Sequence, residues 1–288
     1  MIKEINMRKA LRNIVLALVL AAAAASLFAS GAQEGADGLV TVRLGVVGGI
    51  YDDLWAPAIE TLKEEGINLQ LIQFSDYVTP NNALSSGEID LNAFQHRIYL
   101  ESELEAYGYD LTIVGNSFII PLNLYSEKIT SFDELKDGDT IAIPNDVTNG
   151  GRAIKVLADA GLFELDPEAG FNPTVKDIVK YNKQVEIKEL AANTIASALP
   201  DVTAGIVNGG YAIDYGLKTD EAVLKDTSVS ESEYWNIIVA RTKDLEDPEK
   251  KELYRKVVKA FQQPETERVF NEDFGGYFIK AGWDIDLI

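Results

Sequence analysis

The sequence predicts an α/β fold in which helices cover both faces of mostly parallel sheets. Short segments rich in β-branched and aliphatic residues, such as 40–47, alternate along the chain with amphipathic segments such as 248–261. This alternation is typical of parallel strands linked by helices. The chain has 288 residues, of which 47% are hydrophobic, so it is long enough to bury a substantial core.

Strand and helix signals follow one another from residue 40 onward. Segment 40–47 alternates in the manner of a strand, and apolar residues after Asp53 recur at helical spacing. Gly87 marks a helix end, whereas Asp247 and Pro248 mark a helix start. Strands are expected at 40–47, 69–74, 91–93, 111–114, 123–126, 140–143, 185–190, 205–207 and 235–240. Helices are expected at 54–62, 80–86, 95–107, 149–160, 193–199, 211–215, 248–261 and from 264, with a short one after Ser131.

The composition argues against several classes of function. The formal net charge is −20, and a surface this acidic repels phosphate backbones, so we expect no nucleic-acid partner. The chain has no cysteine and one histidine, His96, which argues against disulfides, thiolate chemistry and a zinc site. A calcium site built from oxygen ligands stays open, although no EF-hand spacing is present. No nucleotide fingerprint is found either, and we expect no cofactor.

Residues 1–31 have the pattern of a secretory signal peptide. Lys3, Arg8 and neighbouring basic residues precede an apolar run at 14–25, and small residues follow at 29–32. The run is shorter than the ~20 residues that a membrane span takes. The alternative is a retained N-terminal anchor. We therefore expect an exported protein with a flexible leader at 32–38.

Four segments combine polar and aromatic residues where a predicted strand passes into a predicted helix, the position at which open α/β sheets bind ligands. In 143–153, two glycines let the backbone approach a ligand, and Arg152 can form a bidentate pair with a carboxylate. Segment 205–212 contributes Asn208, whose amide can bind an ammonium or a carboxylate. Segments 92–99 and 74–81 contribute aromatic walls and one imidazole. The candidate ligand-binding residues are Arg152, Asn208, His96, Tyr99, Phe94, Tyr77 and Asn149.

Each of these features also has an ordinary structural explanation. Arg152 fits a solvated arginine at a helix start, and Asn208 fits a turn asparagine. Phe94 and Tyr99 fit an aromatic pair in the core beside a hydrogen-bonded histidine. Taken together, the four segments suit an amino-acid site, and they lack the close acid–base pair and the nucleophile motif that hydrolysis requires.

In their order along the chain, these segments resemble the methionine-binding lipoproteins of ABC importers, the NlpA/MetQ family. The resemblance covers nearly all of the chain after residue 38, and its order and spacing are more specific than any single motif. The matching stretches are FSDYVTPNNAL (74–84), GEIDLNAFQH (87–96), AIPNDVTNGGRA (142–153), VNGGYAIDYGL (207–217) and NIIVAR (236–241).

The resemblance implies a two-lobed periplasmic-binding-protein type II architecture with the ligand cleft between the lobes. Two segments, near 123–126 and 235–241, would cross between the lobes. The first lobe would then comprise 39–122 and 242–288. The second lobe would comprise 123–241, including the crossing segments.

The resemblance also implies roles for the candidate residues. In this family the arginine of the NGGRA motif, here Arg152, binds the ligand carboxylate, and Asn208 binds the amino-acid head group. Tyr77, Phe94, His96 and Tyr99 would surround the ligand side chain. The expected ligand is L-methionine or a related amino acid. The expected partner is an ABC permease in the membrane, and the protein is expected to act as a monomer.

The chain departs from the family pattern at several positions. The usual Gly-Pro-His-Ala-Glu run is replaced by residues 49–55, Ile98 replaces a proline, and Gly210 replaces a larger polar residue. These changes bear on the exact ligand more than on head-group recognition. Ala32 stands where a lipoprotein carries its lipid-modified cysteine, so lipid attachment there is not expected.

Three functions are compatible with such a cleft. The first is a solute-binding protein, not an enzyme, that works on the outer side of the cytoplasmic membrane. The second is an exported enzyme that acts on an amino acid or short peptide, which would place a buried carboxylate near Arg152. The third is a surface protein that has lost its ligand. The absence of a nucleophile motif and the presence of Arg152 and Asn208 in their motifs favour the first.

Overall fold

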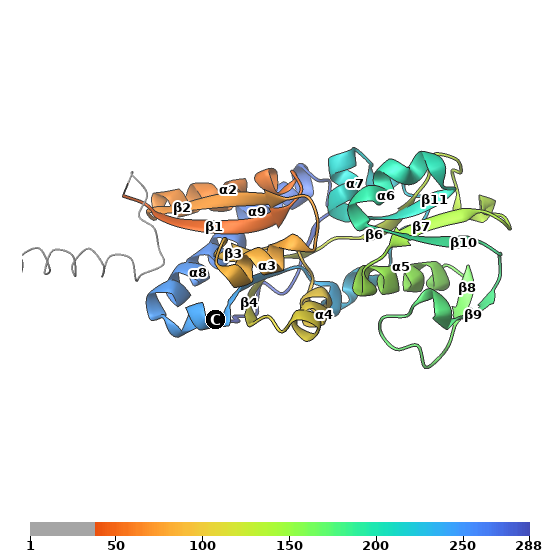
Figure 1. The fold of residues 1–288 in the computed structure, drawn as a ribbon. Coiled ribbons are helices and arrows are strands. Elements are labelled where there is room, and N and C mark those ends of the chain that lie inside the picture. The colour runs from red at the N-terminus through yellow and green to blue at the C-terminus, as the bar shows by residue number, and fades with distance from the viewer. Residues whose placement is uncertain (1–37) are drawn as a thin grey trace, which may run out of the picture.

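The computed structural model describes residues 38–288. These residues form two lobes that lie side by side, each built around its own sheet (Figure 1). The predicted signal peptide at 1–31 and the leader as far as residue 37, including Ala32, lie outside the described residues. Within residues 38–288, no helix has both the length and the apolar character needed to cross a membrane.

The first lobe contains a five-stranded sheet in the order β2-β1-β3-β12-β4. Strand β1 pairs in parallel with β2 and β3, whereas β12 runs antiparallel to β3 and β4. The strands are β1 (Val40–Val47), β2 (Ile67–Phe74), β3 (Leu91–Asn92), β4 (Leu111–Asn116) and β12 (Ile237–Arg241).

The second lobe contains a four-stranded sheet in the order β10-β7-β11-β6. Strand β7 pairs in parallel with both neighbours, and β6 runs antiparallel to β11. The strands are β6 (Leu122–Tyr125), β7 (Thr140–Pro144), β10 (Glu186–Leu190) and β11 (Ala204–Asn208). Two short pairs lie outside these sheets: β5 (Phe118–Ile119) with β13 (Ile279–Lys280), and β8 (Phe163–Leu165) with β9 (Ile178–Tyr181).

The antiparallel strand of each sheet is the one that the chain enters after changing lobes. Strand β6 follows the passage at residues 120–121, and β12 follows the passage between residues 224 and 236. The two segments expected to cross are therefore these sheet strands, and the chain changes lobes just before each of them. This arrangement has the two lobes and the mostly parallel sheets that the sequence predicts.

Helices cover both faces of each sheet, as predicted. In β12, Ile238 and Ala240 face a core shared with α2, α8 and α9, while Ile237 and Val239 face a second core shared with α3 and α4. In β7, Ile141 packs toward α5, and the next residue packs toward α6. The helices are α2 (Tyr51–Glu64), α3 (Thr79–Ser86), α4 (Arg97–Tyr107), α5 (Val147–Asp159), α6 (Ala192–Ala198), α7 (Gly209–Tyr215), α8 (Pro248–Phe261) and α9 (Pro264–Glu272).

Helix starts differ from the sequence prediction where a side chain caps the helix. Helix α4 begins at Arg97 because His96 is extended and its ring accepts a hydrogen bond from the Tyr99 N–H. Helix α5 begins earlier than predicted because Asp146 accepts a hydrogen bond from the Asn149 N–H. The segment after Ser131 forms one 3₁₀ turn. Strands β5, β8, β9 and β13, of two to four residues each, were not predicted, although the equally short β3 was, because segments of this length give only a weak periodic signal.

Candidate functional site

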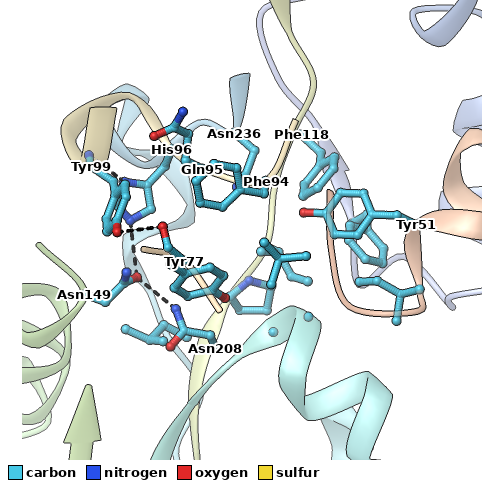
Figure 2. A pocket seen from close by; sticks show the side chains of 18 of the residues that line it. Tyr51, Tyr77, Phe94, Gln95, His96, Tyr99, Phe118, Asn149, Asn208 and Asn236 are labelled. Carbon is cyan, nitrogen blue, oxygen red and sulfur yellow. Dashed lines mark hydrogen bonds between the residues drawn. The ribbon is translucent and has the colours of Figure 1, made fainter. Parts of the chain in front are cut away.

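A cavity lies between the two lobes, and all seven candidate residues line it (Figure 2). The first lobe contributes aromatic residues and His96, and the second lobe contributes Asn149, Arg152 and Asn208. The four segments singled out in the sequence therefore meet at one place, because each lies at the edge of its sheet that faces the other lobe. The lining residues include Tyr51, Tyr77, Phe94, Gln95, His96, Tyr99, Phe118, Ile120, Asn149, Arg152, Asn208, Asn236 and Phe278.

The corner that carries Phe94 and His96 is held by a buried network of amides. Asn81 exchanges two hydrogen bonds with Gln95, at 2.9 and 2.7 Å, and Asn92 donates to Asn81 Oδ1 at 2.9 Å. Because buried amides are costly unless they are paired, this network specifies one conformation of the loop between β3 and α4.

The corner that carries Asn208 depends on a close backbone approach. Gly209 follows Asn208 at the start of α7, and a Cβ atom there would lie 2.3 Å from the side chain of Ile120 and 3.0 Å from the carbonyl oxygen of Pro121. Only glycine allows α7 to begin this close to the passage between the lobes. This contact places Asn208 at the cavity.

Arg152 is buried, with 3% of its surface exposed, so its interpretation as a solvated arginine is wrong. Its Nε donates to Ser228 Oγ at 3.0 Å, and its Nη2 donates to the Ile120 carbonyl oxygen at 3.2 Å and to the Asp226 carboxylate at 2.5 Å. Its guanidinium also lies 4.3 Å from the centre of the Tyr234 ring. Among the described residues, the remaining nitrogen, Nη1, has no acceptor.

Asp226 is the buried anion that balances Arg152. One of its oxygens, Oδ2, accepts from Arg152 and from the Leu122 N–H at 2.9 Å. The other, Oδ1, accepts from the N–H and the hydroxyl of Ser228 at 2.8 and 2.7 Å. The sequence analysis missed Asp226. It belongs to no motif, and it is one of 46 acidic residues in the chain.

A chain of hydrogen bonds crosses the cavity from His96 to Asn208 (Figure 2). His96 Nδ1 accepts from the Tyr99 N–H at 3.1 Å, so in the neutral ring Nε2 carries the proton and donates to Asn149 Oδ1 at 3.2 Å. Asn208 Nδ2 donates to the same Oδ1 at 2.9 Å. Asn149 in turn donates to the carboxylate of Asp146 at 3.1 and 3.2 Å.

The Oδ1 atom of Asn208 is buried and has no hydrogen-bond donor among the described residues. An unsatisfied buried acceptor costs roughly 1–3 kcal/mol, so this atom marks a place for a donor from a ligand. The interpretation of Asn208 as a plain turn asparagine leaves this unpaired atom unexplained.

His96 is held in its neutral form. Burial lowers its pKa most, and the charge of Arg152 lowers it further, so the pKa falls from its ordinary value of 6.5 to about 3. The imidazole therefore acts as a hydrogen-bonding wall of the cavity rather than as a charge.

Aromatic rings form the wall opposite the amides. The ring centre of Tyr77 lies 5.9 Å from that of Phe94 and 5.0 Å from that of Tyr211, which belongs to the second lobe. Tyr99 packs edge-on against Phe94 at 6.1 Å and donates to the Tyr77 carbonyl oxygen at 3.0 Å. The pair of Phe94 and Tyr99 is thus packed as in a core and also lines the cavity, so the two explanations drawn from the sequence are compatible.

The apolar end of the cavity contains residues that the sequence analysis did not select. Tyr51, Phe118, Ile120 and Phe278 line this end, and the hydroxyl of Tyr51 points into the cavity (Figure 2). Tyr51 lies in segment 49–55, which departs from the family pattern. This departure was the one feature of the sequence that could have pointed to Tyr51. The other three residues come from short strands or loops without a periodic pattern.

The geometry suits a small zwitterion with an apolar side chain. Arg152 offers a cationic donor, and Asn208 offers an acceptor for an ammonium. The aromatic walls can surround an apolar side chain. No carboxylate is found among the described residues that line the cavity, and none of the described residues form a cluster suited to a metal ion.

Comparison with known proteins agrees with this geometry. The sequence model of the NlpA lipoprotein family matches residues 42–282. The probable D-methionine-binding lipoprotein MetQ of Vibrio cholerae is 40% identical over 268 residues, covering 92% of this chain and 97% of the relative. The D-methionine-binding lipoprotein MetQ of Escherichia coli K12 is 40% identical over 247 residues, covering 84% of this chain and 88% of the relative.

Two of the solved structures with the same fold have methionine or a methionine transporter in their descriptions. A nutrient binding protein from Burkholderia cenocepacia bound to methionine has a TM-score of 0.78 and 36% identity, covering 84% of this chain and 100% of that one. The substrate binding protein of a methionine transporter from Streptococcus pneumoniae has a TM-score of 0.79 and 31% identity, covering 84% of this chain and 96% of that one.

Removing the partner of Arg152 should destabilise the protein strongly. We expect Asp226→Ala to lower the free energy of unfolding by about 3–5 kcal/mol, because it leaves a buried guanidinium without its anion. Urea unfolding followed by circular dichroism measures this change. Asp220→Ala is the matched control, since it removes an exposed acid of the same lobe and should change stability by less than about 0.5 kcal/mol. Equal effects of the two variants would contradict the role given to Asp226.

Because His96 is neutral in the folded protein, the free energy of unfolding should depend on pH. Between pH 6.5 and 3 the unfolded chain binds a proton at this residue and the folded protein does not, so its contribution is complete above pH 6.5 and is lost as the pH falls. From about pH 7.5 to about pH 5.5, the free energy of unfolding should fall by about 1.4 kcal/mol more in the wild type than in His96→Gln. Urea unfolding at both pH values measures the difference, and identical pH dependence in the two proteins would rule out the neutral histidine.

Proposed function

Because this chain belongs to the NlpA lipoprotein family, we propose that it is an extracytoplasmic solute-binding protein that captures L-methionine or a closely related amino acid. It delivers this ligand to the membrane permease of an ABC transporter. The proposal rests on one observation: the same cavity contains the cationic donor Arg152 and the Asn208 Oδ1 atom, an acceptor that has no hydrogen-bond donor among the described residues. The relatives named above for methionine binding and methionine transport support the same ligand class.

In this proposal each end of the cavity recognises one part of the ligand. The Nη1 atom of Arg152 donates to the ligand carboxylate, since its other nitrogens are occupied by Ser228, Ile120 and Asp226. Asn208 Oδ1 accepts from the ligand ammonium. Tyr77, Phe94, His96 and Tyr99 surround the side chain, and Asn149 orients both His96 and Asn208.

The protein acts outside the cytoplasmic membrane in this proposal, as expected from the signal pattern of residues 1–31. In this proposal it binds its ligand as a monomer, as expected from the sequence, with Arg152 and Asn208 of the same chain at one cavity. The relatives compared above are named lipoproteins. This sequence has Ala32 where the resemblance would place a lipid-modified cysteine, so it offers no thiol for attachment at that position.

The arrangement at Arg152 does not favour the alternative of an exported enzyme. That alternative requires a buried carboxylate near Arg152, and Asp226 meets this requirement by position. Both of its oxygens, however, already accept hydrogen bonds from Arg152, Leu122 and Ser228, so neither is available as a base. Incubation with methionine or methionyl dipeptides should return the ligand chemically unchanged.

The ligand can be identified by thermal unfolding of protein that has been unfolded, dialysed and refolded to remove any bound amino acid. A ligand at 100 times its dissociation constant stabilises by about 2.7 kcal/mol, which corresponds to roughly 5–11 °C in Tm for a chain of this size. We expect this shift with L-methionine, with D-methionine measured alongside. A shift with a different amino acid would change the ligand, and no shift with any amino acid or dipeptide would overturn the proposal.

The carboxylate role of Arg152 should be tested with a change that keeps its charge. Arg152→Lys retains a cation beside Asp226 but lacks the fork that reaches both Asp226 and the ligand. We expect methionine affinity to fall about 10- to 100-fold, the equivalent of one charged hydrogen bond, as measured by isothermal titration calorimetry. Arg268→Lys on the exposed face of α9 is the matched control. Unchanged affinity in Arg152→Lys would remove the carboxylate role from this residue.

A further inference from the structure

Helix α2 begins without a capping side chain of its own. Its N-cap residue, Ile50, makes no side-chain hydrogen bond, and the chain before it is Gly48-Gly49. The N–H groups at the start of a helix have no partner within the helix. The start of α2 therefore needs acceptors from elsewhere in the molecule.

The acceptor comes from the other lobe. Asp214, on α7 of the second lobe, accepts hydrogen bonds from the Gly49 N–H and the Ile50 N–H, each at 3.1 Å. These residues lie 165 and 164 positions apart in the sequence. A carboxylate at a helix N-terminus is stabilised both by the hydrogen bonds and by the helix dipole. Asp214 thus caps a helix of the opposite lobe.

The backbone at Gly48 is shaped for this approach. Its φ is +94°, and a Cβ atom there would lie 2.2 Å from Asp214 Oδ2. The conformation favours glycine, and a side chain here would displace the carboxylate. The chain thus leaves room for the carboxylate at the point where α2 begins.

The contact joins two walls of the ligand cavity. Ile50 and Tyr51, at the start of α2, line the cavity from the first lobe, and Gly209 and Gly210, at the start of α7, line it from the second lobe. The capping carboxylate lies on that same α7, whose first turn directly follows Asn208. Opening of the cleft would separate these walls and break both hydrogen bonds of Asp214.

Two neutral hydrogen bonds lie along the same rim of the cleft. Tyr211 donates to the Ser75 carbonyl oxygen at 3.3 Å, and Asn193 donates to the same oxygen at 3.1 Å. Both join the lobes through uncharged groups. Asp214 differs from them because it brings a charge to a helix terminus.

We propose that Asp214 is a positioning residue for ligand retention: by capping α2 across the cleft, it holds the lobes together over the bound ligand and slows its release. This inference rests on the proposed binding function. The carboxylate does not contact the ligand, so it acts through the two cavity walls that it joins. Its effect falls on the dissociation rate, because the contact forms only when the lobes meet.

The experiment compares Asp214→Ala with Asp220→Ala, an exposed acid of the same lobe with the same charge change. Stopped-flow measurement with methionine should show a dissociation rate about three- to tenfold faster in Asp214→Ala, the size expected for loss of an N-cap acceptor, with little change in the association rate. Asp214→Asn, which keeps one acceptor oxygen, should fall between this variant and the wild type. Equal dissociation rates in Asp214→Ala and Asp220→Ala would overturn the proposal.

A distance measurement separates failure of this inference from failure of the binding function. The chain has no cysteine, so spin labels can be placed through Val78→Cys on the first lobe and Val179→Cys on the second, both well exposed. The population with the shorter label distance should decrease in Asp214→Ala and remain unchanged in Asp220→Ala. If the wild type binds no amino acid, this comparison still decides whether Asp214 holds the lobes together, and no change in the distances would refute it.

A double-mutant cycle tests whether the effect passes through Gly48. Gly48→Ala should also speed dissociation, because its Cβ atom would meet the carboxylate. The strain of alanine at this φ is present in both backgrounds, so the cycle cancels it. If Asp214 acts as proposed, Gly48→Ala speeds dissociation less in the Asp214→Ala background than in the wild type. Full additivity of the two effects would overturn the contact as the cause.

Discussion

A guanidinium buried between two lobes needs an anion within the protein, and most features of this cleft depend on how that requirement is met. Arg152 forms an ion pair with Asp226. The same carboxylate accepts a hydrogen bond from the Leu122 N–H, where the chain enters the second lobe. Arg152 also donates to the Ile120 carbonyl oxygen at the first passage between the lobes and lies against Tyr234 within the second passage. One ion pair thus holds both passages against the start of α5. Because an isolated buried charge is very costly, these segments are constrained to converge.

The ion pair also decides which atoms remain for a ligand. With Nε and Nη2 occupied, Arg152 presents Nη1. Burial lowers the pKa of His96 most, the positive charge of Arg152 lowers it further, and the ring stays neutral. A neutral His96 donates through Nε2 to Asn149, and this bond sets the orientation of the Asn149 amide toward Asn208. The result is one cationic donor and one unpaired acceptor, Asn208 Oδ1. These are complementary to the two charged groups of an amino acid.

The site is assembled only when the lobes are together. His96 belongs to the first lobe and Asn149 to the second, so the hydrogen bond between them crosses the cleft. The aromatic wall is shared in the same way, because the Tyr77 ring packs against the ring of Tyr211 in the other lobe. Ligand binding and lobe closure are therefore coupled, as in hinge-closing proteins in general. The cap that Asp214 provides lies at the rim of the same cleft and is broken by the same movement.

The sequence by itself determined the order of the main strands and helices, the two-lobed α/β fold and seven of the residues that line the cavity. The elements follow from local signals, namely periodicity and helix-start residues such as Asp247 and Pro248. The two lobes and the site residues follow from the motifs at strand–helix corners and from the family resemblance that these motifs carry. Only the tertiary structure decided the partners of those residues. Asp226 belongs to no motif, whereas Asp214 lies in the matching stretch 207–217 and Tyr51 in the departing segment 49–55. No local pattern shows what any of the three contacts, because each acquires its role from a segment far away in the chain. With 46 acidic residues in the sequence, only folding shows which of them faces Arg152 and which reaches the start of α2, because a charge is paired by proximity in space.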